Sequence, residues 1–142
     1  MQLRHSVMVL ALVGLATLGG LAALTNSAEA TATQEAVATI RTPLQVGGRF
    51  LMGRYLVVHD EERKARGEPC TSIYDLGRQG SREPVVAFHC KRVRRDVAEA
   101  FTIESRATDL GWRVLTAYQF PGSDHAHQVL TPREVARSHS TH

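Results

Sequence analysis

The sequence predicts an all-β domain, a small antiparallel β-sandwich or barrel-like fold of about five to six strands behind an N-terminal signal helix. Short segments rich in β-branched and aromatic residues recur roughly every ten residues after residue 40. Turns that contain glycine or proline separate these segments. No segment of this region keeps the 3.6-residue periodicity of an amphipathic helix, which leaves strands as the main element.

Residues 1–30 are predicted to be a cleaved signal peptide that exports the chain to the periplasm or out of the cell. Arg4 and His5 form a short basic start, and residues 6–24 are apolar or small without a charge. The sequence AEA at Ala28–Ala30 offers the small residues that signal peptidase requires. The alternative is a retained membrane anchor, because the apolar run approaches spanning length; the glycines within it and the AEA end favour cleavage.

The chain that remains has the size of one domain and a weak positive charge. Of 142 residues, 112 follow the signal, and the loss of one arginine and one glutamate leaves the net charge at +3. Such a length builds one modest hydrophobic core. A charge this small, on an exported chain, argues against nucleic acid as a partner.

The first half of the domain is predicted to hold two strands and a charged loop. Residues 31–40 are small and polar and are predicted to be a flexible leader to a β-rich domain at residues 41–130. Gly47-Gly48 indicates a turn, and Tyr55–Val58 has the β-branched and aromatic residues of a strand. The charged run Glu61–Glu68 is predicted to be a solvated loop or one helical turn.

The second half is predicted to contain the remaining strands and a flexible tail at residues 131–142. Alternation follows Pro69, and the apolar run at residues 85–93 is the clearest strand of the chain. Strands are also expected at residues 101–103, 112–120 and 128–130. The predicted core consists of the larger apolar residues of these strands: Leu56, Val58, Ile73, Val86, Phe88, Phe101, Ile103, Trp112, Val114, Leu115 and Tyr118.

Cys70 and Cys90 are predicted to form a disulfide. Both lie after the signal, and an even number of cysteines in an oxidising compartment favours pairing. Side chains alternate along a strand, so Cys90 shares a face with Val86 and Phe88 and points into the core. Closing a loop of about 20 residues stabilises a domain by roughly 3 kcal/mol in the chain-entropy model.

Four histidines form an alternative, metal-binding set: His59, His89, His125 and His127. His125 and His127 make a His-x-His pair, which on an extended segment puts both rings on one side, a spacing that suits zinc or copper. Asp60 or Asp124 would orient a ring. If reduced, Cys70 and Cys90 would serve as soft ligands beside His89, which favours Cu(I) or zinc. The competing interpretation is that the histidines are scattered over the surface, and that His139 and His142 belong to a polar tail.

The densest basic run, "KRVRR", has two interpretations. Lys91, Arg92, Arg94 and Arg95 are either a charged strand end that discourages edge pairing or a surface patch for an anionic partner. Lipid head groups, a polysaccharide or an acidic protein would fit such a patch.

Catalysis is the least favoured function, because no complete catalytic motif is present. A nucleophilic Cys90 would need one of the histidines as its base, and a cysteine that faces the core is poorly placed for this. The chain lacks the GxSxG, HExxH, P-loop, CxxC and CxxCH patterns.

The segments "FLMGRYLVVHDEERKARGEPCTSIYD", "PVVAFHCKRVRR" and "YQFPGSDHAH" together resemble a group of small exported bacterial proteins of acidobacterial type. The linked elements are GxYxVVHD, PC, FHC and YQFxGSxxAH, and the resemblance covers residues 48–130. It implies export and a β-rich domain, and no catalytic residue.

The sequence as a whole predicts an exported, disulfide-stapled binding or structural module, with a zinc- or copper-binding protein as the alternative. Its partner would be a protein or a cell-envelope component. No membrane span is expected once the signal is cleaved.

Overall fold

The computed structural model describes residues 33–78 and 82–140, and the predicted signal peptide lies outside this part of the chain. Eight strands and two short helices make up the described residues. In chain order they are β1 (Thr33–Val46), β2 (Arg49–Asp60), α1 (Glu61–Ala65), β3 (Thr71–Asp75), β4 (Val86–Phe88), β5 (Cys90–Arg94), β6 (Thr102–Ala107), β7 (Arg113–Gln119), β8 (His125–Val129) and α2 (Pro132–His139).

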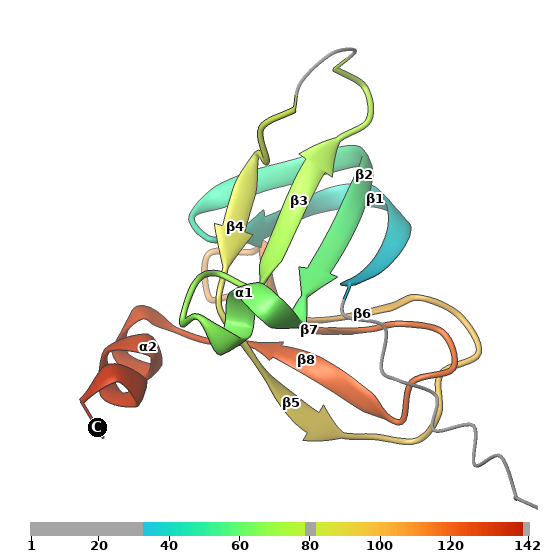
Figure 1. Cartoon of the computed structure of the whole chain (residues 1–142). Coiled ribbons are helices and arrows are strands. Elements are labelled where there is room, and N and C mark those ends of the chain that lie inside the picture. The colour runs from blue at the N-terminus through green and yellow to red at the C-terminus, as the bar shows by residue number, and fades with distance from the viewer. Residues whose placement is uncertain (1–32, 79–81, 141–142) are drawn as a thin grey trace, which may run out of the picture.

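The strands form one sheet that curls into a nearly closed, barrel-like shape (Figure 1). Its strand order is β4-β3-β2-β1-β7-β8-β5, and β6 pairs with β7. The two ends of this order, β4 and β5, are consecutive in the chain and are separated by His89 alone. The mainly β prediction is confirmed, but the strands of the described residues number eight rather than five to six, partly because the run predicted as one strand at residues 85–93 is divided into β4 and β5.

The β1–β2 hairpin pairs more residues than any other two strands, and in place of the flexible leader predicted at residues 31–40 it has a strand at the described residues 33–40. From Thr33 onward, β1 pairs with β2 antiparallel, ending at Val46 opposite Arg49. The small polar residues at the start of β1 lack apolar content, yet they gain a strand partner along the whole length of β2. The prediction from local composition is therefore wrong for these residues, because backbone hydrogen bonds to a strand distant in the sequence determine their conformation.

Three further boundaries differ from the sequence prediction. The run predicted as one strand is divided at His89 into β4 and β5. The final strand, β8, begins at His125 instead of residue 128 because it pairs with β5 and β7. The predicted tail contains the helix α2, and a capping box between Thr131 and Glu134 stabilises the start of this helix. Where a charged loop or one helical turn was expected, α1 forms a single turn capped by Asp60.

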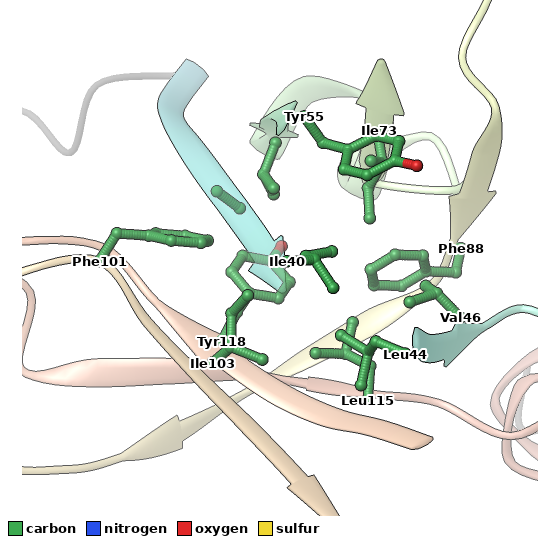
Figure 2. Close-up of a pocket in the computed structure, with 12 residues that line it drawn as sticks. Ile40, Leu44, Val46, Tyr55, Ile73, Phe88, Phe101, Ile103, Leu115 and Tyr118 are labelled. Carbon is green, nitrogen blue, oxygen red and sulfur yellow. The ribbon is translucent and has the colours of Figure 1, made fainter. Parts of the chain in front are cut away.

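The core fills the inside of the barrel with side chains from β1, β2, β3, β4 and β7 (Figure 2). The buried predictions Ile73, Val86, Phe88, Leu115 and Tyr118 are confirmed. Phe101 and Ile103 pack partly buried against this core. A void of about 10 Å³ remains, lined entirely by apolar surface. Dense packing of this kind leaves no room for a ligand inside this part of the fold.

The prediction for β2 chose the wrong face of the strand. Tyr55, Val57 and His59 point inward and are buried, whereas Leu56 and Val58 are half-buried on the other face. Trp112 and Val114 are likewise half-buried. Every residue from Leu56 to Val58 is apolar, so the alternation of apolar and polar residues does not indicate which face of β2 is buried. In the structure the buried face is the one that includes His59.

No helix in the described part of the chain is long and apolar enough to cross a membrane.

The turn between β1 and β2 generates a stability prediction. Gly47 and Gly48 have φ of 54° and 79°, and a Cβ on Gly47 would lie 2.7 Å from Cγ2 of Val86, whereas a Cβ on Gly48 would meet nothing within 4 Å. We expect Gly47→Ala to lower the free energy of unfolding by about 2–4 kcal/mol, through backbone strain and the clash together. The matched variant Gly48→Ala carries backbone strain alone and should lose about 1 kcal/mol. Equal losses in urea unfolding would contradict the close packing of Gly47 on β4.

Candidate metal centre

Three buried side chains that can bind a metal meet at one end of the barrel. His59 is the second-last residue of β2, Cys90 is the first residue of β5, and His127 lies in the middle of β8. His59 pairs across the sheet with Thr71, Cys90 with Val129, and His127 with Arg92 and Tyr118. Figure 1 shows α1 beside the end of β2, next to the point where β4 passes into β5.

The ligand atoms of these three residues all lie within 4.8 Å of one another. The Cys90 Sγ is 3.6 Å from His59 Nδ1 and 3.7 Å from His127 Nδ1. Both histidines are 0% exposed and Cys90 is 5% exposed. The group is therefore part of the interior and not a surface cluster.

The two sulfur–nitrogen separations match those expected around a single metal ion. An ion about 2.3 Å from sulfur and about 2.0–2.1 Å from nitrogen, with bond angles of about 109–120°, holds the sulfur and nitrogen about 3.5–3.8 Å apart. Both sulfur–nitrogen distances of the site fall in this range. Thiolate and imidazole are the ligands that zinc and Cu(I) share.

Glu61 orients His59. Its Oε1 lies 2.8 Å from His59 Nε2, so this nitrogen carries the proton and donates it, which leaves the lone pair on Nδ1, toward Cys90. Arg92 donates to the same Oε1 from Nη2 at 2.7 Å. Burial raises the pKa of the Glu61 carboxyl, but hydrogen bonds from His59 and Arg92 outweigh burial and bring it to about 2. A carboxylate behind a ligating histidine is a recurrent feature of protein metal sites.

His127 is held in the neutral form that binds metals. Burial is the main cause that lowers the pKa of His127 to about 3, with further lowering from the neighbouring His59 and His125. Its ring stacks on Tyr118 with 5.0 Å between centroids. Among the described residues, its Nε2 has no hydrogen-bond partner although it is buried. An unpartnered buried nitrogen is costly, but the ring nitrogen that faces Cys90 is Nδ1, so an ion bound there would leave Nε2 without a partner.

Cys70 and Cys90 meet, as predicted, but as two thiols rather than a disulfide. Their sulfur atoms are 2.7 Å apart, which is longer than the bond of about 2.05 Å in a disulfide. The structure therefore places the two sulfurs in contact without a bond, and the disulfide stays a prediction. The cause is positional: Cys70 immediately precedes β3 and Cys90 immediately follows the break at His89, so both face the same end of the barrel.

The two thiols share a proton. The hydrogen bond with Cys90 lowers the pKa of the Cys70 thiol against the opposing effect of burial, and His59 adds to the decrease. The same hydrogen bond, together with burial, raises the pKa of the Cys90 thiol. The pair consequently loses its first proton easily and holds the second tightly, which supplies one negative charge beside the two imidazoles.

Two hydroxyl groups complete the polar surroundings of the site. The Tyr118 hydroxyl lies 3.3 Å from His59 Nδ1 and makes a short hydrogen bond with Thr71 Oγ1. Thr71 also donates to the Cys90 sulfur at 3.7 Å. Burial raises the pKa of Tyr118, so the phenol stays protonated and can donate.

The structure assembles half of the predicted histidine set. His59 and His127 belong to the site, whereas His89, between β4 and β5, is not one of the converging ligands and has its ring 6.2 Å from that of His139. His125 shares a side of β8 with His127, as the His-x-His spacing predicts, and their ring centroids are 5.3 Å apart. Its Nδ1, however, contacts Ser123 and Asp124, and His125 is not one of the three converging ligands.

The sequence analysis missed the roles of Glu61 and Tyr118 in this site. Asp60, proposed as the partner of His59, instead caps α1 through hydrogen bonds to the amides of Glu62 and Arg63. The predicted partner of His59, Asp60, is thus the residue immediately before the actual partner, Glu61. Only the turn of α1 after β2 determines which carboxylate reaches back to His59.

The basic run forms ion pairs within the chain. Lys91 lies 3.6 Å from Glu134, Arg92 2.7 Å from Glu61, Arg94 3.5 Å from Asp124 and Arg95 3.3 Å from Glu104. Each cation of the predicted anionic-surface patch thus faces a carboxylate. This arrangement favours the interpretation of a charged strand end over a patch for an anionic partner.

No protein-family model, curated protein or solved structure matches this chain. The resemblance to small exported bacterial proteins therefore stays a prediction.

The depressed pKa of His127 generates a prediction about stability in acid. The pKa of this histidine is lower in the folded chain than in the unfolded chain, so at low pH the unfolded chain takes up the proton first. The folded state is therefore most stable above the unfolded pKa and loses stability as the pH falls below it. With a folded pKa of about 3 and an ordinary value of 6.5, the loss begins near pH 6.5. Between pH 7 and pH 5 the metal-free chain should lose about 2 kcal/mol of unfolding free energy from this residue.

The measurement is urea unfolding with a chelator present, comparing the wild type with His127→Gln. Glu61 titrates at lower pH, since its folded pKa is about 2 and its ordinary value 4.5, so it contributes little in this window. The variant should show a shallower loss of stability from pH 7 to pH 5. Identical slopes would contradict a buried neutral His127.

Proposed function

We propose that the protein binds a single zinc or Cu(I) ion at His59, Cys90 and His127. The observation that carries this proposal is the convergence of one sulfur and two imidazole nitrogens within 4.8 Å in the interior. Three elements far apart in sequence supply these ligands, so their convergence is a property of the whole fold. The binding alternative of the sequence analysis is thereby preferred over a purely disulfide-stapled module.

The burial of the site favours holding a metal over catalysis. Catalytic metal sites keep one position open to water or substrate, whereas structural and binding sites are closed by protein ligands. Here all three ligands are buried, and the rings of Tyr118 and Phe120 pack on His127 at 5.0 and 5.8 Å between centroids. The bound ion would stabilise the end of the barrel as well as being retained by it.

The location that we propose for this binding is the periplasm or the cell exterior, on the basis of the signal-like residues 1–30. A protein or cell-envelope component remains the proposed partner class. A buried metal centre on a small exported domain suits capture and safe storage of an ion.

Replacing the ligands provides the first test of this function. We expect Cys90→Ser and His127→Asn to weaken metal binding by about 100-fold or more, since each removes one of three ligands. Native mass spectrometry under reducing conditions should find one ion on the wild type. His89→Asn and His125→Asn are the matched controls and should retain it. Equal binding by all four variants would place the ion elsewhere.

Glu61 should contribute through the orientation of His59. Glu61→Gln removes the negative charge behind the ring, and we expect metal affinity to fall by about 10–100-fold. Glu68→Gln is the control, because Glu68 is an exposed carboxylate that pairs with Arg66 at 2.8 Å and does not contact a ligand. Chelator competition gives both affinities. If the two variants lose affinity equally, Glu61 does not act on His59.

Oxidation and metal binding should exclude each other, because both use the Cys90 sulfur. Exchange with a small disulfide would join Cys70 and Cys90 and release two thiols of the reagent. We expect the oxidised chain to bind metal at least about 100-fold more weakly than the reduced chain. Intact mass distinguishes the states by two protons, and metal analysis gives the occupancy. An oxidised chain that keeps its ion would show that Cys90 is not a ligand.

A further inference from the structure

The arginines of this chain differ in whether a carboxylate lies opposite them. Arg49 and Arg54 belong to β2 and Arg78 follows β3, and all three are exposed. Among the described residues, none of the three forms an ion pair. Each cation of the basic run Lys91–Arg95, by contrast, faces a carboxylate of the chain. The guanidinium groups of β2 and of the residue after β3 are therefore available to an anionic partner outside the chain.

Large apolar side chains are exposed beside these arginines. Phe50 is 53% exposed, Met52 63% and Leu76 43%. Phe50 and Met52 share the outer side of β2, because side chains alternate along a strand and Leu51 between them is buried. The amide of Leu76 donates to the carbonyl of Arg54 at 3.1 Å, which holds the residue after β3 beside β2. Apolar side chains exposed together on a small domain are typical of an interaction surface.

An open pocket of about 320 Å³ brings two of the arginines together. Arg49, Phe50 and Arg78 are among the residues that line it. Asp75 also lines the pocket, and its carboxylate accepts a hydrogen bond from the amide of Gly77 at 2.8 Å. Two guanidinium groups outweigh one carboxylate, so the pocket favours an anion. A phosphate group suits it, because guanidinium groups bind phosphate oxygens through two hydrogen bonds at once.

We propose that the face of an anionic phospholipid bilayer binds to an arginine–apolar surface, which is made of Arg49, Phe50, Met52, Arg54, Leu76 and Arg78. The guanidinium groups would contact lipid phosphates, while the apolar side chains enter the boundary between head groups and acyl chains. A soluble anion would use the guanidinium groups alone and leave the apolar side chains in water. The presence of both kinds of side chain on one surface therefore favours a bilayer.

The arginine–apolar surface lies away from the metal centre. In the pairing of β2 with β3, His59 is opposite Thr71 at one end, and Tyr55 is opposite Asp75 at the other. The arrow of β3 points away from α1 in Figure 1. Membrane binding is thus a property beyond the proposed metal binding, and either one can fail without the other.

The test measures how much of the purified chain sediments with vesicles of phosphatidylcholine alone, or of phosphatidylcholine and phosphatidylglycerol in equal parts. We expect binding to the mixed vesicles, weakened by high salt because salt screens the arginines. The double variant Arg49→Gln/Arg78→Gln should bind about 10-fold more weakly or worse, and Met52→Gln/Leu76→Gln should lose about 10-fold as well. All proteins carry the same N-terminus, so residues 1–30, if retained, contribute equally to each.

Two matched controls show whether the losses belong to this surface. Arg66 is exposed but pairs with Glu68 at 2.8 Å, and Val97 is 63% exposed, as Met52 is. Arg66→Gln and Val97→Gln should each change the affinity by less than about twofold, because charges beyond a Debye length are screened and Val97 is not part of the surface. Unchanged urea unfolding shows that all variants stay folded, since every substituted side chain is exposed.

Trp112 gives a second readout that needs no variant, because it is the one tryptophan of the chain and its ring lies 5.6 Å from that of Phe50. Brominated phosphatidylglycerol in the vesicles should quench its fluorescence. Equal vesicle binding by both double variants and both controls would overturn the proposal, as would a wild type that does not bind the mixed vesicles. If polyglutamate binds as tightly as the vesicles and Met52→Gln/Leu76→Gln loses nothing, the surface takes an acidic protein and not a bilayer.

Discussion

The change of strand partner at His89 is the constraint on which the rest of this structure depends. Before this residue the chain pairs with β3, and after it the chain pairs with β8, which is at the other end of the sheet order. One short segment therefore links the two ends of a curled sheet. Phe88 packs in the core on one side of the break, and Cys90 enters the polar end of the barrel on the other.

This closure explains why polar side chains gather at one end of an interior that is mainly apolar. The strands β2, β5, β7 and β8 each bring a polar or titratable side chain to the same end, where His59, Cys90, Tyr118 and His127 are all buried. Buried polar groups destabilise a fold unless they find partners. Most of these groups have partners here, but the Nε2 of His127 has none among the described residues. The nitrogens that face Cys90 are instead His59 Nδ1 and His127 Nδ1, and a bound ion would give these two nitrogens and the sulfur a common partner.

Disulfide and metal ligand, which the sequence presents as alternatives for Cys90, would both use a sulfur that the structure places beside Cys70. Both states need Cys70 and Cys90 to be adjacent, and both use the Cys90 sulfur. The redox state of the compartment would then set how much of the protein can hold metal. Glu61 connects the site to the surface, because its carboxylate links the buried His59 to the exposed Arg92.

The sequence by itself determined the fold class, the inward direction of Cys90 and the meeting of the two cysteines. Strand-rich apolar runs and the two-residue alternation are local properties, and they are readable without knowing any partner. The same patterns also placed His127 and His59 among the metal-binding candidates.

Only the tertiary structure decided which candidates converge. The run Leu56–Val58 is apolar on both faces, so the inward side of β2, and with it His59, depended on pairing with β1 and β3. The polar start of β1 became a strand because β2 offered it a partner. His125 and His89 were excluded by contacts with Ser123, Asp124 and His139, which no spacing reveals. Strand partners that are distant in the chain determine which face is buried and which side chains converge there. The sequence shows only which residues are neighbours along the chain.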